Sequence, residues 1–259
     1  MSKLIDKLVQ VSQGTLQPMG FGATMHKTKT PSMLLLARLQ KADVSIVKAI
    51  KGVVDGLIQI LPNLADGKDS FRQILKSADE VPCGALMEEI TEKDVTALVK
   101  EGGDFLVLAP AKTPYPVLEE ENVGKILILE SSLEEGLIRA VEEMAVDALL
   151  MEEVNEPSFT VSKLMVYQYL AGLTSKPLLT TVPLDLNSRN LRGLQDAGIT
   201  GIVTDITDAR QKAELADLKK AIEGLPSPSR EGHGRASVYL PFASLKTSDV
   251  STEEEEEEE

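Results

Sequence analysis

Residues 176–205 read KPLLTTVPLDLNSRNLRGLQDAGITGIVTD, and this stretch decides the fold. It opens with an apolar run at 177–182 and continues through a polar stretch in which Asn187 or Ser188 can cap a helix. It then turns at Gly198 and ends in a second apolar run at 201–206. Two apolar runs separated by one helix predict parallel strands joined by a helical crossover.

The same unit recurs along the chain. Apolar runs predict eight buried strands, at 33–38, 56–60, 84–89, 105–110, 126–130, 148–153, 177–182 and 201–206. The stretches between and after them predict helices at 44–52, 69–78, 92–101, 117–122, 133–144, 158–174, 188–197 and 208–224. This alternation predicts an α/β fold, a closed (βα)8 TIM barrel. A strand at 17–22 would give the alternative count of nine.

Turn and cap signals support these boundaries. A hydroxyl followed three residues later by a carboxylate predicts helix starts at Thr91 with Asp94 and at Ser132 with Glu135, and Asp208 can cap a further helix. Glycines that permit a left-handed turn precede three strands, at Gly102-Gly103, Gly124 and Gly198. The crossover at 111–124 contains Pro114 and Pro116, so we expect a lid or site loop there.

Three regions follow from this pattern. Residues 1–31 form an N-terminal amphipathic helix, over 1–13, and a loop or hairpin that closes the barrel. Residues 32–225 form the barrel. Residues 226–259 are expected to be a disordered acidic tail, because they end in seven consecutive glutamates. Within that tail the apolar segment YLPFASL, residues 239–245, is expected to dock on the barrel or bind a partner.

Composition narrows the partners and the location. The net charge of −14 argues against nucleic acid and anionic membranes, so a small molecule, a cation or a protein partner is expected. The protein partner could be a second copy, bound through residues 1–13 or 239–245. The single cysteine, Cys83, excludes an intramolecular disulfide and favours a reducing compartment, so we expect a cytoplasmic protein.

Residues 176–205 resemble the last two strands of aldolase-type and ribulose-phosphate-binding barrels, and GGDFLVLAP at 102–110 resembles one of their middle strands. The resemblance implies a phosphate site built from glycines after the seventh and eighth strands. This sequence has Thr180, Thr181 and Pro183 at the first place and Thr204 and Asp205 at the second. The glycines of a phosphate site are therefore missing at both places. We also expect no flavin or nicotinamide cofactor, because the sequence carries no signature for either. The sixth strand also lacks the lysine of a Schiff-base aldolase.

Acidic residues close several of the predicted strands, at the end where barrels of this class bind ligands. Four of them fall at equivalent positions and so share one face of their strands: Glu88, Glu130, Glu152 and Asp205. If that face is the interior, the four carboxylates converge on the mouth of the barrel. Such a cluster needs a cation or an Arg or Lys partner, so the sequence predicts a Mg²⁺ or Mn²⁺ site. Arg38 and Lys112 are expected to act in catalysis by holding a substrate carboxylate, and Thr180 and Thr181 to bind substrate.

Two functions fit these features. The first is a small metal-assisted lyase or aldolase that acts on a carboxylate- or carbonyl-bearing molecule. The alternative is a non-catalytic barrel that serves as a ligand-binding or protein-interaction scaffold. The two histidines, His26 and His233, lie far from the predicted strand ends, so a carboxylate or lysine would have to be the general base.

Overall fold

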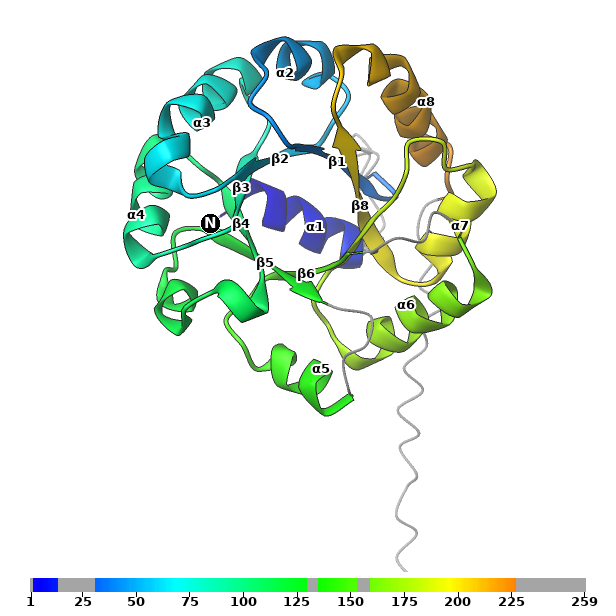
Figure 1. The fold of residues 1–259 in the computed structure, drawn as a ribbon. Helices are drawn as coiled ribbons and strands as arrows, with labels where there is room; N and C mark the ends of the chain where they lie inside the picture. The colour runs from blue at the N-terminus through cyan, green and yellow to red at the C-terminus, as the bar shows by residue number, and fades with distance from the viewer. Residues whose placement is uncertain (1, 14–30, 130–134, 153–158, 227–259) are drawn as a thin grey trace, which may run out of the picture.

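The structure is a computed structural model that describes residues 2–13, 31–129, 135–152 and 159–226. Its centre is a closed barrel of parallel strands in the order β1 to β8, in which β1 pairs with β8 (Figure 1). The strands are β1 Leu34–Leu39, β2 Gly56–Leu61, β3 Cys83–Met87, β4 Phe105–Leu108, β5 Gly124–Leu129, β6 Ala148–Met151, β7 Leu178–Thr181 and β8 Ile199–Ile206. The TIM barrel predicted from the sequence is confirmed.

Helices surround the barrel in chain order (Figure 1). They are α2 Val44–Ile50, α3 Leu64–Ala78, α4 Glu92–Glu101, α5 Glu135–Glu142, α6 Val161–Leu173, α7 Ser188–Asp196 and α8 Lys212–Glu223, with short 3-10 helices η1 Pro110–Lys112, η2 Tyr115–Glu119 and η3 Ala209–Gln211. No helix in the described ranges is both long and apolar enough to cross a bilayer. The tail, the 17–22 alternative strand and the Ser132 cap fall outside those ranges.

Local signals explain several of these boundaries. Thr91 and Asp94 form the expected capping box of α4, and the side chain of Asn187 accepts a hydrogen bond from the amide of Asn190 at the start of α7. Gly102 and Gly198 adopt left-handed backbone conformations, as their turns require. One prediction was wrong in detail: α3 begins five residues before the expected 69, because Asn63 caps it at Leu64.

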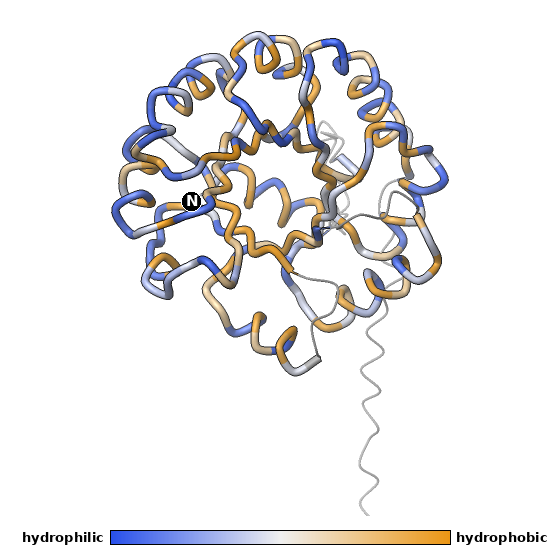
Figure 2. The backbone as a smooth tube through the Cα atoms, viewed as in Figure 1, coloured by the Kyte–Doolittle hydropathy of each residue, from blue (hydrophilic) through white to orange (hydrophobic). Residues whose placement is uncertain are grey.

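Side chains alternate between two layers of core. Outward-facing strand residues pack against the helices, and inward-facing ones fill the barrel, so the strands are predominantly apolar along their length (Figure 2). The inward set identifies lumen-facing positions in every strand except β3, whose Leu86 is only partly buried against it: Leu34, Leu36, Ile58, Phe105, Val107, Ile126, Ile128, Ala148, Leu150, Leu179 and Val203.

The N-terminal helix α1, Lys3–Gln13, lies across the amino-terminal end of the barrel (Figure 1). Its apolar face, Leu4, Leu8 and Val11, is buried within the barrel core, while Asp6 and Lys7 remain exposed. Glycines make room for it, because a Cβ on Gly56 or Gly201 would touch a leucine of α1 at 3.1 and 3.3 Å. The helix therefore closes the bottom of the barrel.

An aspartate at the start of β4 fixes the N-terminus of α1. The Asp104 carboxylate accepts hydrogen bonds from the amides of Lys3, at 2.8 Å, and Leu4, at 3.0 Å, and from the Ser2 hydroxyl, at 2.8 Å. These amides have no partner within the helix, and the helix dipole favours an anion at this end. Asp104 thus completes the cap that Ser2 begins, since the Ser2 hydroxyl itself accepts from the amide of Ile5 at 3.3 Å.

Gly124 was predicted to form a turn before β5, and this prediction was wrong. The residue is the first of β5, and no left-handed backbone conformation is found there. A Cβ at this position would lie 2.6 Å from Ile5 and 2.7 Å from Ser2. Gly124 is therefore needed for the close approach of α1 rather than for a turn.

Candidate functional site

The carboxyl ends of the strands form the open end of the barrel, since α1 occupies the other. Arg38 is the fifth residue of β1, two positions after Leu36, so its side chain leaves the strand on the same face as the lumen-facing Leu34 and Leu36. Asp205 of β8 follows Val203 by two residues, and Glu152 follows Leu150 by two. All three side chains therefore start from the inner surface of the barrel, at its open end.

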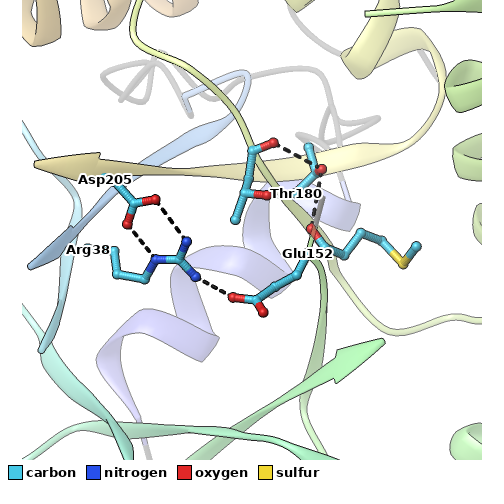
Figure 3. Close-up of polar contacts among 6 residues, drawn as sticks. Arg38, Glu152, Thr180 and Asp205 are labelled. Atoms are coloured by element: carbon cyan, nitrogen blue, oxygen red, sulfur yellow. Dashed lines mark hydrogen bonds and ion pairs between the residues drawn. The ribbon is translucent and has the colours of Figure 1, made fainter. Parts of the chain in front are cut away.

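Arg38 joins the two carboxylates (Figure 3). Its Nε and Nη2 donate to Oδ1 and Oδ2 of Asp205 at 2.7 and 2.9 Å, and its Nη1 donates to Oε1 of Glu152. Asp205 is directly beside Arg38 in the β1–β8 register, whereas Glu152 immediately follows the end of β6. We call Arg38, Glu152 and Asp205 the mouth triad.

Exposure and charge define what the mouth triad can do. Side-chain exposure rises from 15% at Arg38 through 31% at Glu152 to 44% at Asp205, so a ligand can reach both acids. The hydrogen bonds from its guanidinium to Asp205 raise the pKa of Arg38; burial opposes this, and the charges of Asp205 and Glu152 add to it. The triad carries one positive and two negative charges, a net −1 when all three are ionised.

Arg38 and Glu152 keep groups that a ligand could use, whereas both oxygens of Asp205 are bound to Arg38. The contacts made by the described residues use three of the five N–H donors of the Arg38 guanidinium, leaving one on Nη1 and one on Nη2. Both oxygens of Asp205 accept from Arg38, so this carboxylate mainly orients the guanidinium. Glu152 uses only Oε1 on Arg38, which leaves Oε2 for proton transfer.

The two predicted substrate-binding threonines face opposite sides of the barrel wall. Thr181 follows the lumen-facing Leu179 by two residues and shares its side. Thr180 is fully buried, and its hydroxyl lies 2.9 Å from the hydroxyl of Tyr167 on α6. Thr180 therefore binds the surrounding helix layer, and only Thr181 has a position from which it could contact a ligand.

The other predicted site residues are not joined to the triad by any contact found in the described chain. Glu88 is exposed after β3, where its amide donates to the carbonyl of Leu61, and Lys112 is exposed in η1. Glu130 lies outside the described residues. Within 2–13, 31–129, 135–152 and 159–226, no group of three or more His, Cys, Asp or Glu side chains is arranged to hold a metal ion. The metal site remains a prediction.

The short helix after β8 occupies the place where many barrels bind phosphate. The Asp208 side chain accepts from the amide of Arg210 at 2.8 Å, and the Gln211 side chain accepts from the amides of Thr207 and Asp208 at 2.8 and 3.0 Å. The chain thus fills the N-terminus of η3 with its own side chains. The sequence predicted that Asp208 caps a helix, but not that Gln211 takes part. The three-residue spacing of Asp208 and Gln211 is that of a capping box, and this spacing could have indicated the role of Gln211.

No protein-family model matches the sequence, and neither does any curated protein. Solved structures do match. Thiamine phosphate pyrophosphorylase from Pyrococcus furiosus is 16% identical with a TM-score of 0.55, over 74% of this chain and 96% of that one. A mutant tryptophan synthase alpha-subunit from the same organism is 10% identical with a TM-score of 0.55, over 73% and 96%. A protein from Aquifex aeolicus VF5 is 13% identical with a TM-score of 0.59, over 85% and 96%.

These comparisons and the strand order together define the class: the chain is a TIM-barrel protein. The fold is one that enzymes share. At these identities the likeness shows the fold alone, and the site must be judged from its own residues.

Proposed function

We propose that this barrel is an enzyme that acts on a small carbonyl-bearing molecule at its open end, with the mouth triad as its catalytic centre. The observation that carries the proposal is the contact of Arg38 with both Asp205 and Glu152 at the ligand-binding end of the barrel. A charged side chain that faces a barrel interior is costly to hold, and functional sites are where such clusters concentrate.

The geometry supports a division of roles. The remaining Nη1 and Nη2 donors of Arg38 would bind and polarise a carbonyl oxygen, and would stabilise an enolate oxygen as negative charge develops there. Oε2 of Glu152 would remove a proton from the adjacent carbon and return it to the product. Asp205 would act as a positioning residue through its two hydrogen bonds to Arg38.

Charge and the filled η3 terminus restrict the substrate. The net −1 charge of the triad favours a neutral carbonyl compound or a monoanion over a doubly charged phosphate. Three amides at and just before the start of η3, those of Thr207, Asp208 and Arg210, already donate to the side chains of Asp208 and Gln211. Both features support a substrate without a phosphate group, which departs from the ribulose-phosphate-binding barrels that the sequence resembles.

The divalent ion expected from the sequence fits the described residues poorly. Glu152 and Asp205 both contact Arg38, and Arg38 supplies the positive charge that the carboxylates would otherwise need from a metal. We therefore route no step of the proposed reaction through Mg²⁺ or Mn²⁺. A metal-assisted lyase or aldolase stays the more specific hypothesis, with Glu88, Glu130, Glu152 and Asp205 as its ligands.

A ligand screen tests the proposal. Melting temperatures would be measured with a panel of small aldehydes, ketones and oxo-acids, with inorganic phosphate, and with Mg²⁺, Mn²⁺ and EDTA. We expect carbonyl compounds to raise the melting temperature of the wild-type chain and to lose that effect in Glu152→Gln and Arg38→Lys. Arg192→Met is the matched control, because the Arg192 side chain is 66% exposed on α7, where it forms an ion pair with Asp196.

The outcomes separate the candidates. A shift with carbonyl compounds that the control keeps and the triad variants lose supports the proposal. A shift with Mg²⁺ or Mn²⁺ that Glu152→Gln removes favours the metal-assisted reaction. If no compound or metal shifts the wild-type chain, the proposal is wrong, and the non-catalytic scaffold becomes the better hypothesis.

A further inference from the structure

Helix α6 presents apolar side chains on the side that faces away from the barrel. Val161, Met165 and Tyr169 follow one another at four-residue spacing and are 73%, 64% and 47% exposed. The opposite side of the helix buries Tyr167 and Leu170 against the barrel. We call Val161, Met165 and Tyr169 the α6 ridge.

Such a ridge is unusual for an outer helix of a barrel, which normally turns polar side chains to water. The exposed positions of α6 within 161–173 include Ser162, Gln168 and Gly172 but no charged residue. The neighbouring helix α5 adds Leu137, 54% exposed, and Met144 follows its end. Five of the six large exposed hydrophobic residues in the described chain thus belong to this one side of the molecule (Figure 1).

One segment of the chain suits the ridge in composition. Residues 239–245, YLPFASL, carry no charge and include Tyr239, Leu240, Phe242 and Leu245. The sequence on either side is polar or acidic, and it ends in seven glutamates. This segment has the apolar side chains that a partner of the ridge would need.

The last described residue places that segment within reach. The carbonyl of Pro226 accepts hydrogen bonds from Gln195 of α7, at 2.9 Å, and from Ser32, at 3.1 Å. Helix α7 packs directly against α6. Twelve residues separate Pro226 from Tyr239, and a connection of this length spans up to about 40 Å, which exceeds the ~10 Å between neighbouring packed helices.

We propose that residues 239–245 bind the α6 ridge of the same chain, with Leu240 and Phe242 covering Val161 and Met165. Tethering favours this occupant over a second copy, because a short linker gives the segment an effective concentration on the order of millimolar. Removing the ridge from water supplies the driving force, at roughly 25 cal/mol per Å² of apolar surface buried. The proposal is independent of the reaction proposed for the barrel mouth.

Methionine oxidation in the full chain tests this contact. Met165 should be oxidised by dilute peroxide several-fold faster in Leu240→Asp/Phe242→Asp than in the wild-type chain. Ser237→Asp/Thr247→Asp is the control, because it adds the same two charges just outside the segment. A Met165→Cys/Phe242→Cys pair should also form a disulfide at a rate independent of protein concentration, and buried Cys83 would not compete.

Two results would overturn the proposal. Equal oxidation of Met165 in the wild-type chain and in the Leu240→Asp/Phe242→Asp variant would show that the segment does not cover the ridge. Protection of Met165 that increases with protein concentration and survives the double substitution would assign the ridge to a second copy of the chain instead.

Discussion

Gly124 of β5 and Ser2 at the start of α1 approach so closely that a Cβ on Gly124 would lie 2.7 Å from both the Cβ and the hydroxyl oxygen of Ser2. Real Cβ atoms do not tolerate contacts of this length, so α1 would have to shift. The relationship joins the second residue of the chain to a strand in its middle, and it shows that the barrel is built to receive the helix.

We therefore expect Gly124→Ala to destabilise the protein by about 1–3 kcal/mol, as overpacked cores generally do. Chemical denaturation followed by circular dichroism would measure the loss. Gly136→Ala is the control, because Gly136 is exposed on α5 and a Cβ there meets nothing within 4 Å. An equal effect of the two substitutions would refute the steric argument.

Asp104→Ala should loosen α1 at its N-terminus. The substitution removes the acceptor of two helix amides and of the Ser2 hydroxyl, and loss of a helix cap typically costs about 1–2 kcal/mol. Hydrogen exchange within 3–13 should accelerate as well, whereas Asp185→Ala at an exposed position should leave it unchanged. Additive effects of Asp104→Ala and Ser2→Ala in a double-mutant cycle would argue against the contact.

Glu101 should contribute to stability in a pH-dependent way. Hydrogen bonds from Arg72 and Lys68 lower the pKa of this carboxyl to about 2 from its ordinary value of 4.5. A carboxyl with a lowered folded-state pKa stabilises the fold above its unfolded value, and that contribution disappears as the pH falls from about 4.5 to about 2.

The measurement is the free energy of unfolding between pH 7 and pH 2 for wild type and Glu101→Gln. We expect Glu101→Gln to be less stable at neutral pH and the difference to vanish toward pH 2. Glu80→Gln, at an exposed position, should follow the wild-type profile throughout. A constant difference at all pH values would mean that the carboxyl acts by packing and not by its charge.

Cys83 should be unreactive in the folded protein. Burial raises the pKa of its thiol to about 12, with a smaller contribution from the charge of Asp104, and thiolates are the reactive form. A thiol reagent at pH 8 should modify the native chain far more slowly than the chain in denaturant. Ala213→Cys, at an exposed position on α8, should react at once in the native protein, and rapid native reaction of Cys83 itself would disprove its burial.

Much of the architecture could be predicted because buried parallel strands are apolar along their whole length. The apolar runs at 56–60 and 201–206 could each be recognised as a strand from their own residues alone. Eight such strands alternating with helices then predicted a closed barrel. How closely α1 packs against the barrel strands could not be predicted. It depends on Gly56, Gly124 and Gly201 all facing the N-terminal segment, and these glycines come together only through the pairing of strands far apart in sequence.

The site was partly predicted for a similar reason. Alternation along the strands correctly placed Glu152 and Asp205 on the inner surface, and Arg38 was identified as the residue near the end of its strand. Their contact could not be predicted, because Arg38 and Asp205 become neighbours only when the first strand pairs with the last. Thr180 and Thr181 are consecutive residues of one strand, so their side chains face opposite sides of the barrel wall. Expecting both of them to bind substrate overlooked this alternation.

The position of α1 has a consequence for how the chain is made. Its apolar face packs against β8 as well as β1, and part of its cap comes from Asp104, just before β4. During synthesis α1 therefore has no complete binding surface until β8, the last strand of the barrel, has been made. A chaperone or a fused N-terminal domain that holds these first residues would thus delay the final step of assembly while leaving the earlier strand–helix units free to form.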